Sequence, residues 1–274
     1  MPIALYYKAM LSELTPELNV LVEKEILHFY DDYPQKENLP IWHRLFSDFP
    51  DSPESIEARW RRAIHLAGME EFTHANEMVD QGLKMIEKQL EKSAGSSLTE
   101  AEQIIRKPAK TVITDYDLKR LKRKFQYLQS LISPANIGTD KSVGRLTAQF
   151  IVLNPHDIYY KKQLDYLLEQ AGPNNPLTDN IVLAQTLLIS DVIQRAEQLG
   201  KIAKNFAGSD GGIQARFEQA SVKLTIWKEQ QLSDGEKEKY LAEAQSGLKI
   251  FIKENPNCYL SEMAQEKLSV LPSN

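Results

Sequence analysis

Hydrophobic residues along this chain recur every three or four positions, which is the spacing of one face of an α-helix. One such stripe runs from Ile56 to Ala67, and a second runs from Phe72 to Ile86. Gly68 lies between them, and glycine is the residue expected just past a helix C-terminus, so the two stripes predict a pair of helices joined by a tight turn. Because almost no segment shows the alternating pattern of a β-strand, we expect an all-α protein of about a dozen helices.

Prolines, glycines and capping residues divide the rest of the chain into further helices. Ser233 and Glu236 form a capping box, as do Ser97 and Glu100, and each pair marks a helix start. Helix ends are expected where a proline interrupts the pattern. Besides a short helix after Ser97, helices are expected over residues 16–30, 41–49, 115–133, 140–153, 157–171, 179–206, 213–228, 234–254 and 259–271.

A fifteen-residue motif occurs twice in the chain, 157 positions apart. The first copy begins at Phe49 and ends at Ala63, and the second begins at Phe206 and ends at Ala220. Six of the fifteen positions are identical, and Trp60 of the first copy is matched by a phenylalanine in the second. The matching positions suit a helix pair, so the duplication predicts a repeated structural unit.

Each copy opens a helix pair with an aromatic residue early in its first helix. In the first pair, glycine stands at the turn, and Phe72 and Ala75 begin the second helix. This arrangement resembles the tetratricopeptide repeat, and the linker over residues 49–53 is similar to that of bacterial envelope versions of the repeat. The resemblance covers two blocks of the chain, about residues 49–90 and 200–271.

The resemblance implies a short right-handed α-solenoid of antiparallel helix pairs, closed by the last helix as a cap. It also implies a non-enzymatic scaffold that binds other proteins along the concave face of the solenoid. In the register of the repeat, Arg61 and His65 face this groove in the first copy, and Glu218 and Val222 face it in the second. The second copy departs from the family in its turn, which is enlarged to residues 229–235.

The middle of the chain lacks the signature of the repeat. Residues 93–97 have the composition of a flexible linker. We therefore expect N-terminal helical repeats over residues 1–92, an irregular linker with a short helix over 93–112, and central and C-terminal repeats over 113–274 that continue one solenoid. The sequence leaves open whether the middle consists of diverged repeats or of an insertion.

The distribution of charge singles out one helix. The formal net charge is −5, but residues 102–124 hold eight basic and three acidic residues, whereas residues 13–32 hold six acidic residues and one lysine. Basic side chains lie on the helix expected over 115–133, away from its apolar seam. Together with Arg61 and His65, the candidate partner-binding residues are Lys119, Arg120, Lys122, Arg123 and Lys124.

Three interpretations of this basic helix stay open. It is a solvated face, or it docks onto an acidic or extended segment of a partner protein, or it is an adaptor for nucleic acid or an anionic surface. The acidic net charge and a single stacking candidate, Tyr127, argue against nucleic acid. The opposite charges of the two segments also suit end-to-face contacts between copies, which would build extended arrays. The sequence therefore favours a scaffold that helps to assemble or organise a larger complex.

Residues that carry catalytic or metal chemistry are sparse. The five histidines lack helical metal-pair spacing, and no phosphate loop, dinucleotide fingerprint or nucleophile elbow occurs, so we expect no catalytic site, cofactor or metal. Residues 208–212 are expected to be an inter-repeat linker. Cys258 is either a reactive thiol near a helix start or a half-buried packing residue. The alternative is an enzyme of unrecognised helical type, with carboxylates such as Asp179, Asp191 and Glu197 in a groove.

No stretch reaches the roughly 18 consecutive apolar residues needed to span a bilayer, so we expect no transmembrane segment. The N-terminal residues lack the basic region and the cleavage site of a signal peptide. A cytoplasmic location is the default expectation, with the periplasm or another exported compartment as the alternative if a natural leader has been removed.

Overall fold

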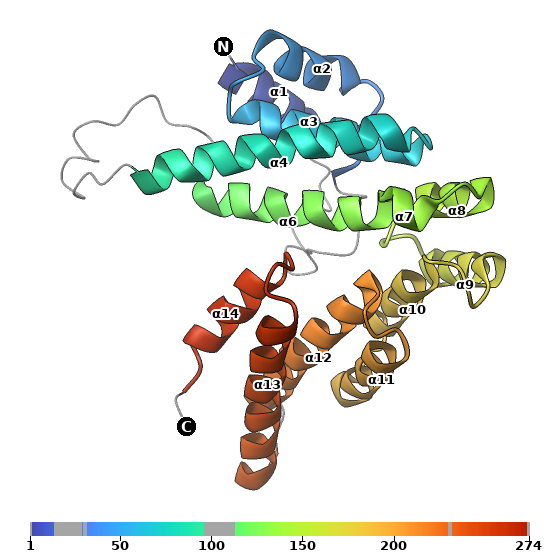
Figure 1. Ribbon diagram of the computed structural model, residues 1–274, viewed down its shortest axis with the longest axis vertical. Coiled ribbons are helices and arrows are strands. Elements are labelled where there is room, and N and C mark those ends of the chain that lie inside the picture. Colours follow the sequence, from blue (N-terminus) through green and yellow to red (C-terminus); the bar gives the residue numbers. More distant parts are fainter. Residues whose placement is uncertain (1, 14–28, 30–31, 96–112, 230–231, 273–274) are drawn as a thin grey trace. The chain divides into compact units, whose positions relative to one another are not determined.

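The structure, a computed structural model, describes residues 2–13, 29, 32–95, 113–229 and 232–272. The elements labelled in Figure 1 are all α-helices, and the described ranges contain no β-strand, so the predicted all-α class is confirmed. The arrangement of the helix pairs as a right-handed α-solenoid stays a prediction. Of the helix expected over 16–30, the described ranges include Phe29 alone, and this residue is not helical. The short helix expected after Ser97 lies outside the described ranges.

The chain forms two compact units, Met1–Pro155 and His156–Asn274. In the first unit, each described helix from α1 to α8 packs against the next described helix along the chain, and this includes α4 against α6. The central helix α3 contacts α1, α6 and α8 as well. The helices of this unit are α1 (Pro2–Glu13), α2 (Leu39–Asp48), α3 (Glu54–Gly68), α4 (Phe72–Gly95), α6 (Asp115–Ile132), α7 (Pro134–Ile137) and α8 (Lys141–Ile151).

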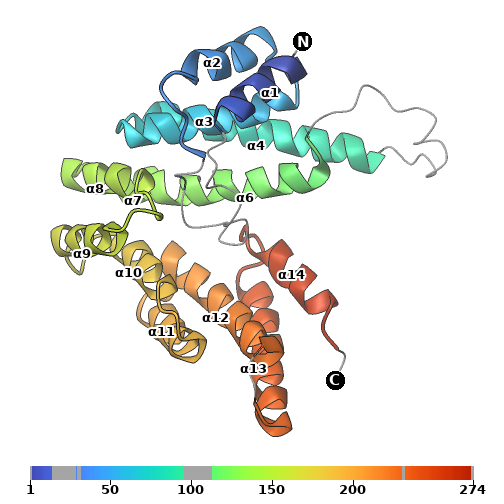
Figure 2. The same ribbon diagram turned by 180° about the vertical axis from the view of Figure 1, so that it is seen from behind.

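Aromatic side chains hold α6 against α3 and α4. The buried ring of Phe125 meets the edge of Trp60 with centroids 5.3 Å apart. A Cβ atom at Gly82 would lie 2.4 Å from the same phenylalanine ring, so this glycine allows α6 to approach α4. The two helices lie side by side in both views (Figure 1, Figure 2).

This packing places α6 in the same unit as the N-terminal helices. Residues 93–112, expected to separate two parts of the chain, instead connect α4 to α6 inside one unit, and the unit boundary falls at Pro155. Ser93 itself belongs to α4, which continues to Gly95. The domain division read from the sequence therefore differs from the compact units of the structure.

The second unit repeats the neighbour-to-neighbour packing. Each helix from α9 to α14 contacts the next, and α10 also contacts α12. Its helices are α9 (Tyr160–Ala171), α10 (Thr178–Leu187), α11 (Val192–Asn205), α12 (Asp210–Glu229), α13 (Asp234–Glu254) and α14 (Ser261–Ser269). The capping box of Ser233 and Glu236 at the start of α13 is confirmed.

The prediction of a single helix over 179–206 is wrong, because a turn separates α10 from α11. The Asp191 carboxylate accepts hydrogen bonds from the backbone N–H groups of Ile193 and Gln194, both at 2.9 Å, and so starts a new helix. Arg195 Nε donates to the carbonyl of Ile189 at 2.7 Å and holds the turn before it. The side-chain cap thus outweighs the continuous apolar pattern.

The glycine-rich linker predicted over 208–212 is shorter than expected. Gly208 has a φ of 90°, which suits a turn, but α12 already begins at Asp210. The N–H of Gly211 donates to Asp179 Oδ2 at 2.9 Å, and a Cβ atom on this glycine would lie 2.8 Å from the same oxygen. Close approach of α10 to the first turn of α12 is the physical reason for a glycine at this position.

The duplicated motif has the same local structure in both copies. Phe49 and Phe206 each follow a helix, and their N–H groups donate to Leu45 and Ile202 respectively. Three residues later, the serine N–H donates back to the phenylalanine carbonyl at 3.1 Å in both copies. The next helix then buries Trp60 in one copy and its counterpart Phe217 in the other. The sequence repeat is therefore a repeated turn and helix start.

Candidate functional site on helices α3 and α6

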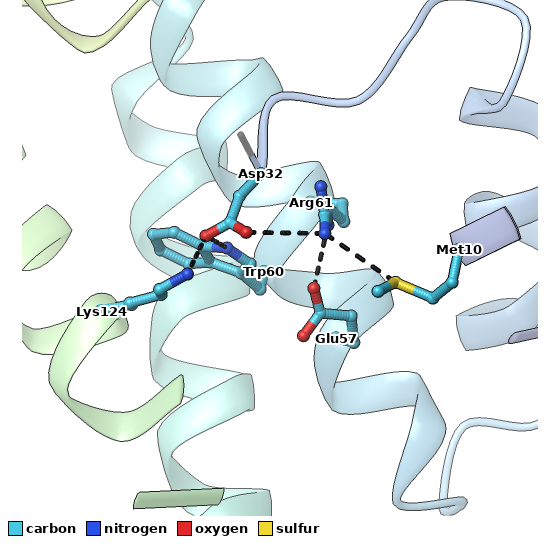
Figure 3. A network of polar contacts seen from close by, with 6 residues as sticks. All are labelled: Met10, Asp32, Glu57, Trp60, Arg61 and Lys124. Carbon is cyan, nitrogen blue, oxygen red and sulfur yellow. Dashed lines mark hydrogen bonds and ion pairs between the residues drawn. The ribbon is translucent and has the colours of Figure 1, made fainter. Parts of the chain in front are cut away.

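The buried carboxylate of Asp32 joins α3 to α6 (Figure 3). Trp60 Nε1 donates to its Oδ2 atom at 2.9 Å, and the ammonium of Lys124 pairs with the same oxygen. Arg61 Nη2 lies 3.5 Å from Oδ1. Asp32 is 8% exposed, so these three donors stand in for the water that an exposed carboxylate would bind.

The positions of these donors follow from helix geometry. Trp60 and Arg61 are consecutive in α3, and successive helical side chains point about 100° apart. The indole and the guanidinium therefore approach different oxygens of one carboxylate. Lys124 precedes the core residue Phe125 in α6, so its side chain leaves the packed seam on the side that faces Asp32.

A second acid completes the network one helical turn earlier. Glu57 Oε1 accepts from Arg61 Nε at 2.9 Å, and both side chains are buried. The Arg61 guanidinium also lies 5.5 Å from the ring centroid of Trp42 and 3.9 Å from the sulfur of Met10. Two carboxylates thus face two cations, which is the balance that makes buried charges tolerable.

The surroundings of Asp32 keep it ionised. Burial by itself would raise the pKa of this carboxyl group. The charges of Lys124 and Arg61, with the hydrogen bonds from Lys124 and Trp60, outweigh burial and hold the pKa well below its usual range. The site is therefore a fixed arrangement of opposite charges at neutral pH.

Two aromatic residues flank Asp32 and contact the same helices. The ring of Phe29 stacks on Tyr127 of α6 with centroids 5.4 Å apart, and it is tilted against Trp60 at the same distance. The hydroxyl of Tyr33 lies 3.4 Å from His65 Nδ1. We call Phe29, Asp32 and Tyr33 together the 29–33 segment, since one short stretch of chain supplies all three contacts.

The structure corrects the expectation for Arg61. This residue was expected to face an open groove, but it is 4% exposed and its guanidinium is held by Glu57 and Asp32. His65 is half-buried beside Tyr33, and burial, together with the nearby charge of Arg62, lowers its pKa. Both predicted groove residues therefore contact the chain itself.

The predicted basic residues of α6 fall into two groups. Lys124 points into the unit and pairs with Asp32. The other four are half-buried rather than fully solvated, and they lie outside the ion pairs drawn in Figure 3: Lys119, Arg120, Lys122 and Arg123. The structure brings Arg61, His65 and Lys124 together around the 29–33 segment and leaves the remaining predicted residues along α6.

Sequence reasoning missed Phe29, Asp32, Tyr33 and Glu57. The signal available for Asp32 was charge, because it ends the acidic run that begins at residue 13, and this run was expected to complement the basic helix. The two segments do meet at Asp32 and Lys124, within one chain. Nothing in the local pattern pointed to the aromatic residues.

When the two copies of the motif are aligned, Glu218 of α12 corresponds to Arg61 of α3. Glu218 is half-buried, and burial raises its pKa to about 7, although Lys267 and Arg195 act in the opposite direction. Val222 was expected to face a groove, but it is buried. The two copies therefore share a backbone pattern but not the charge of this position.

The carboxylates of the enzyme alternative do not form one cluster. Asp179 is buried and accepts from the N–H of Gly211, while Asp191 starts α11 and Glu197 is exposed on that helix. Within the described ranges, no three or more His, Cys, Asp or Glu residues are grouped so that they could hold a metal ion. Burial raises the pKa of the Cys258 thiol, which favours the packing interpretation over a reactive thiolate.

Comparison of the chain with protein-family models, with curated proteins and with solved structures finds no match. In the part of the chain that the structure describes, none of the helices combines the length and the apolar character needed to cross a membrane.

Proposed function

We propose that this chain is a non-enzymatic scaffold that binds protein segments on its helix faces and helps to organise a larger complex. The observation that carries the proposal is the repeated turn and helix start at Phe49 and Phe206, together with packing in which each helix contacts its neighbours along the chain. Repeat proteins built in this way present extended surfaces to partners. A short right-handed solenoid resembling the tetratricopeptide repeat is the arrangement we propose.

The half-buried basic residues of α6 are the proposed outer part of the binding surface. Their charge suits an acidic or extended segment of a partner protein. A second copy of the chain is one such partner, because residues 13–32 are rich in acids. Lys124 is not counted in this surface, since it already pairs with Asp32.

The test is charge reversal on α6. We expect the triple substitution Lys119→Glu, Arg120→Glu and Arg123→Glu to weaken association with a purified partner, or self-association measured by light scattering. The partner is found by affinity purification from the native organism and mass spectrometry. A matched control reverses two exposed lysines of α11, Lys201→Glu and Lys204→Glu. Equal binding by the folded triple variant and the wild type at physiological salt would remove the basic helix from the mechanism.

A further inference from the structure

We infer that α3 and α6 form a peptide-recognition face, and that the 29–33 segment occupies it as an internal ligand that a partner peptide of the same chemistry displaces. The inference rests on the proposed function and deepens it by naming the chemistry of the partner. That partner presents an aromatic residue, an acidic residue three positions later and an aromatic residue directly after the acid.

Each side chain of the 29–33 segment has its own place on the face. Phe29 lies against Trp60 and Tyr127, with both ring centroids 5.4 Å away. Asp32 meets the donors of Trp60, Arg61 and Lys124. The three-residue separation of ring and carboxylate is fixed by a turn in which the Asp32 N–H donates to the Phe29 carbonyl at 3.0 Å.

Tyr33 provides the third anchor, one further helical turn along α3. Its hydroxyl lies 3.4 Å from His65 Nδ1, and a Cβ atom at Gly68 would lie 2.9 Å from the same hydroxyl oxygen. Glycine therefore leaves room for the tyrosine. The anchors follow α3 in order from Trp60 to Gly68, as expected for a short peptide that lies along a helix.

These contacts between the segment and the two helices run through side chains, so any chain with the same side chains at the same spacing can make them. The acidic anchor adds selectivity. Without Asp32, Lys124 and Arg61 would face each other with Glu57 as the remaining acid of the network. The emptied face would carry excess positive charge, which favours an acidic ligand and disfavours a neutral or basic one.

The internal ligand controls the apparent affinity for an external one. A tethered segment acts at an effective concentration on the order of millimolar. A free peptide with the same contacts therefore binds the wild-type chain weakly, because only the fraction of molecules with an empty face is competent. Weakening the internal contacts raises this fraction and tightens the apparent binding of the free peptide.

The experiment uses a synthetic, end-capped peptide with the sequence of residues 27–36 and measures its binding to the full chain by fluorescence anisotropy. The receptor variant Phe29→Ala with Tyr33→Ala weakens the internal ligand and retains Asp32. We expect this variant to bind the peptide at least about tenfold more tightly than the wild type. A peptide with asparagine in place of Asp32 should lose most of this binding.

Two further receptor variants test where the peptide binds. In the Phe29→Ala and Tyr33→Ala background, Lys124→Met should abolish the gain, whereas Lys88→Met, at an exposed lysine of α4, should leave it intact. The inference is overturned if the variant, shown by circular dichroism to be helical, binds the peptide no more tightly than the wild type, or if Lys88→Met and Lys124→Met act alike.

A second measurement covers the case in which the double variant does not fold. Hydrogen exchange of the wild-type chain is followed by mass spectrometry with and without millimolar peptide. Displacement should speed exchange in the fragment containing residues 32–38 and leave fragments of α13 unchanged. Unchanged exchange in the first fragment at millimolar peptide overturns the inference.

The outcomes separate this inference from the proposed function, because the peptide comes from the chain itself and requires no cellular partner. If the peptide fails to bind but charge reversal on α6 still weakens association with a partner, the proposed scaffold function is supported and the internal-ligand inference is overturned. If the peptide binds as expected but no partner depends on α6, the recognition face stands and the proposed outer surface does not.

Discussion

Asp32 and Trp60 are joined by a hydrogen bond of 2.9 Å between the indole nitrogen and a carboxylate oxygen, across 28 positions of the chain. Trp60 is the aromatic residue that marks the duplicated motif, and its counterpart Phe217 has no such donor. The first copy of the repeat therefore makes a polar contact to a segment outside the repeat, which Phe217 cannot make in the second copy. This contact makes Asp32 the residue whose substitution tests the site most directly.

We expect Asp32→Asn to lower the free energy of unfolding by about 2–4 kcal/mol at pH 7, because it leaves Lys124 and Arg61 without their shared carboxylate. Urea unfolding followed by tryptophan fluorescence and far-ultraviolet circular dichroism measures the change. The control is Asp48→Asn, which removes an exposed ion pair with Arg44 and should cost less than about 1 kcal/mol. Equal costs for the two substitutions would show that the buried network does not stabilise the first unit.

The same network predicts how stability responds to acid. A carboxyl group whose folded pKa lies below its unfolded value contributes stability above the unfolded pKa, near 4, and loses it as the pH falls toward the folded pKa. The pKa of Asp32 is lowered in this way. The wild type should therefore lose its advantage over Asp32→Asn as the pH is lowered below about 4, in urea titrations at matched ionic strength. A constant difference between the two proteins over this range would contradict the ion pairing.

A double-mutant cycle between Asp32 and Lys124 isolates their interaction. With Asp32→Asn and Lys124→Met, we expect a coupling energy of about 1–3 kcal/mol. The reference cycle combines Asp32→Asn with Arg123→Met instead of Lys124→Met. Arg123 lies next to Lys124 in α6 but outside the network, so this cycle should give a coupling within about 0.5 kcal/mol of zero. Similar coupling in both cycles would mean that α6 acts through its overall charge rather than through one ion pair.

Glu218 should make the second unit less stable as the pH rises. Its pKa in the folded chain is raised to about 7, above the ordinary glutamate value, so the folded state binds the proton more tightly than the unfolded state. Stability is then highest below about 4.5 and falls as the pH rises to about 7. Glu218→Gln removes this dependence and should stabilise the chain by about 1–2 kcal/mol at pH 8, with little effect at pH 4.5.

Thermal unfolding at the two pH values measures the Glu218 effect. Glu197→Gln is the control, since this glutamate is exposed on α11. Destabilisation by Glu218→Gln at pH 8 would show that the attraction of Lys267 and Arg195 outweighs the cost of burial.

The sequence was sufficient for features that depend on neighbouring residues. The helix after Phe49, its duplicate after Phe206 and the capping box at Ser233 were all predicted, because spacing and caps are local signals. The break between α10 and α11 was missed, since a single aspartate cap lies inside a mostly apolar run. Local pattern alone gave no way to decide which signal would prevail there.

The site was beyond sequence reasoning because its parts are distant in the chain. Asp32 and Lys124 are 92 positions apart, and only their opposite charges hinted at a contact. Arg61 was expected to face an open groove, and the segment that covers it could not be foreseen. Periodicity shows which face of a helix is special, and it does not show what lies against that face.

The close approach of α4 and α6 gives a final prediction about the packing beneath the site. A Cβ atom at Gly82 would lie 2.4 Å from the ring of Phe125, so Gly82→Ala should force the helices apart and cost about 1–3 kcal/mol despite the better helix propensity of alanine. The matched control is Gly247→Ala in α13, where the new atom would lie 3.3 Å from Ala220 Cβ. That substitution should be close to neutral, because the helix propensity of alanine offsets the tight contact.

Relief of the clash should restore stability if packing is the cause. We expect Phe125→Leu to cost less in the Gly82→Ala background than in the wild type, since the smaller side chain leaves room for the new methyl group. Urea unfolding of the four proteins gives this comparison. Phe125 follows Lys124 in α6 and its ring contacts Trp60, so Gly82→Ala should also loosen the Asp32 pair, seen as faster hydrogen exchange at residues 32–38. Additive costs for Gly82→Ala and Phe125→Leu would place the glycine outside the contact that couples α4 to α6.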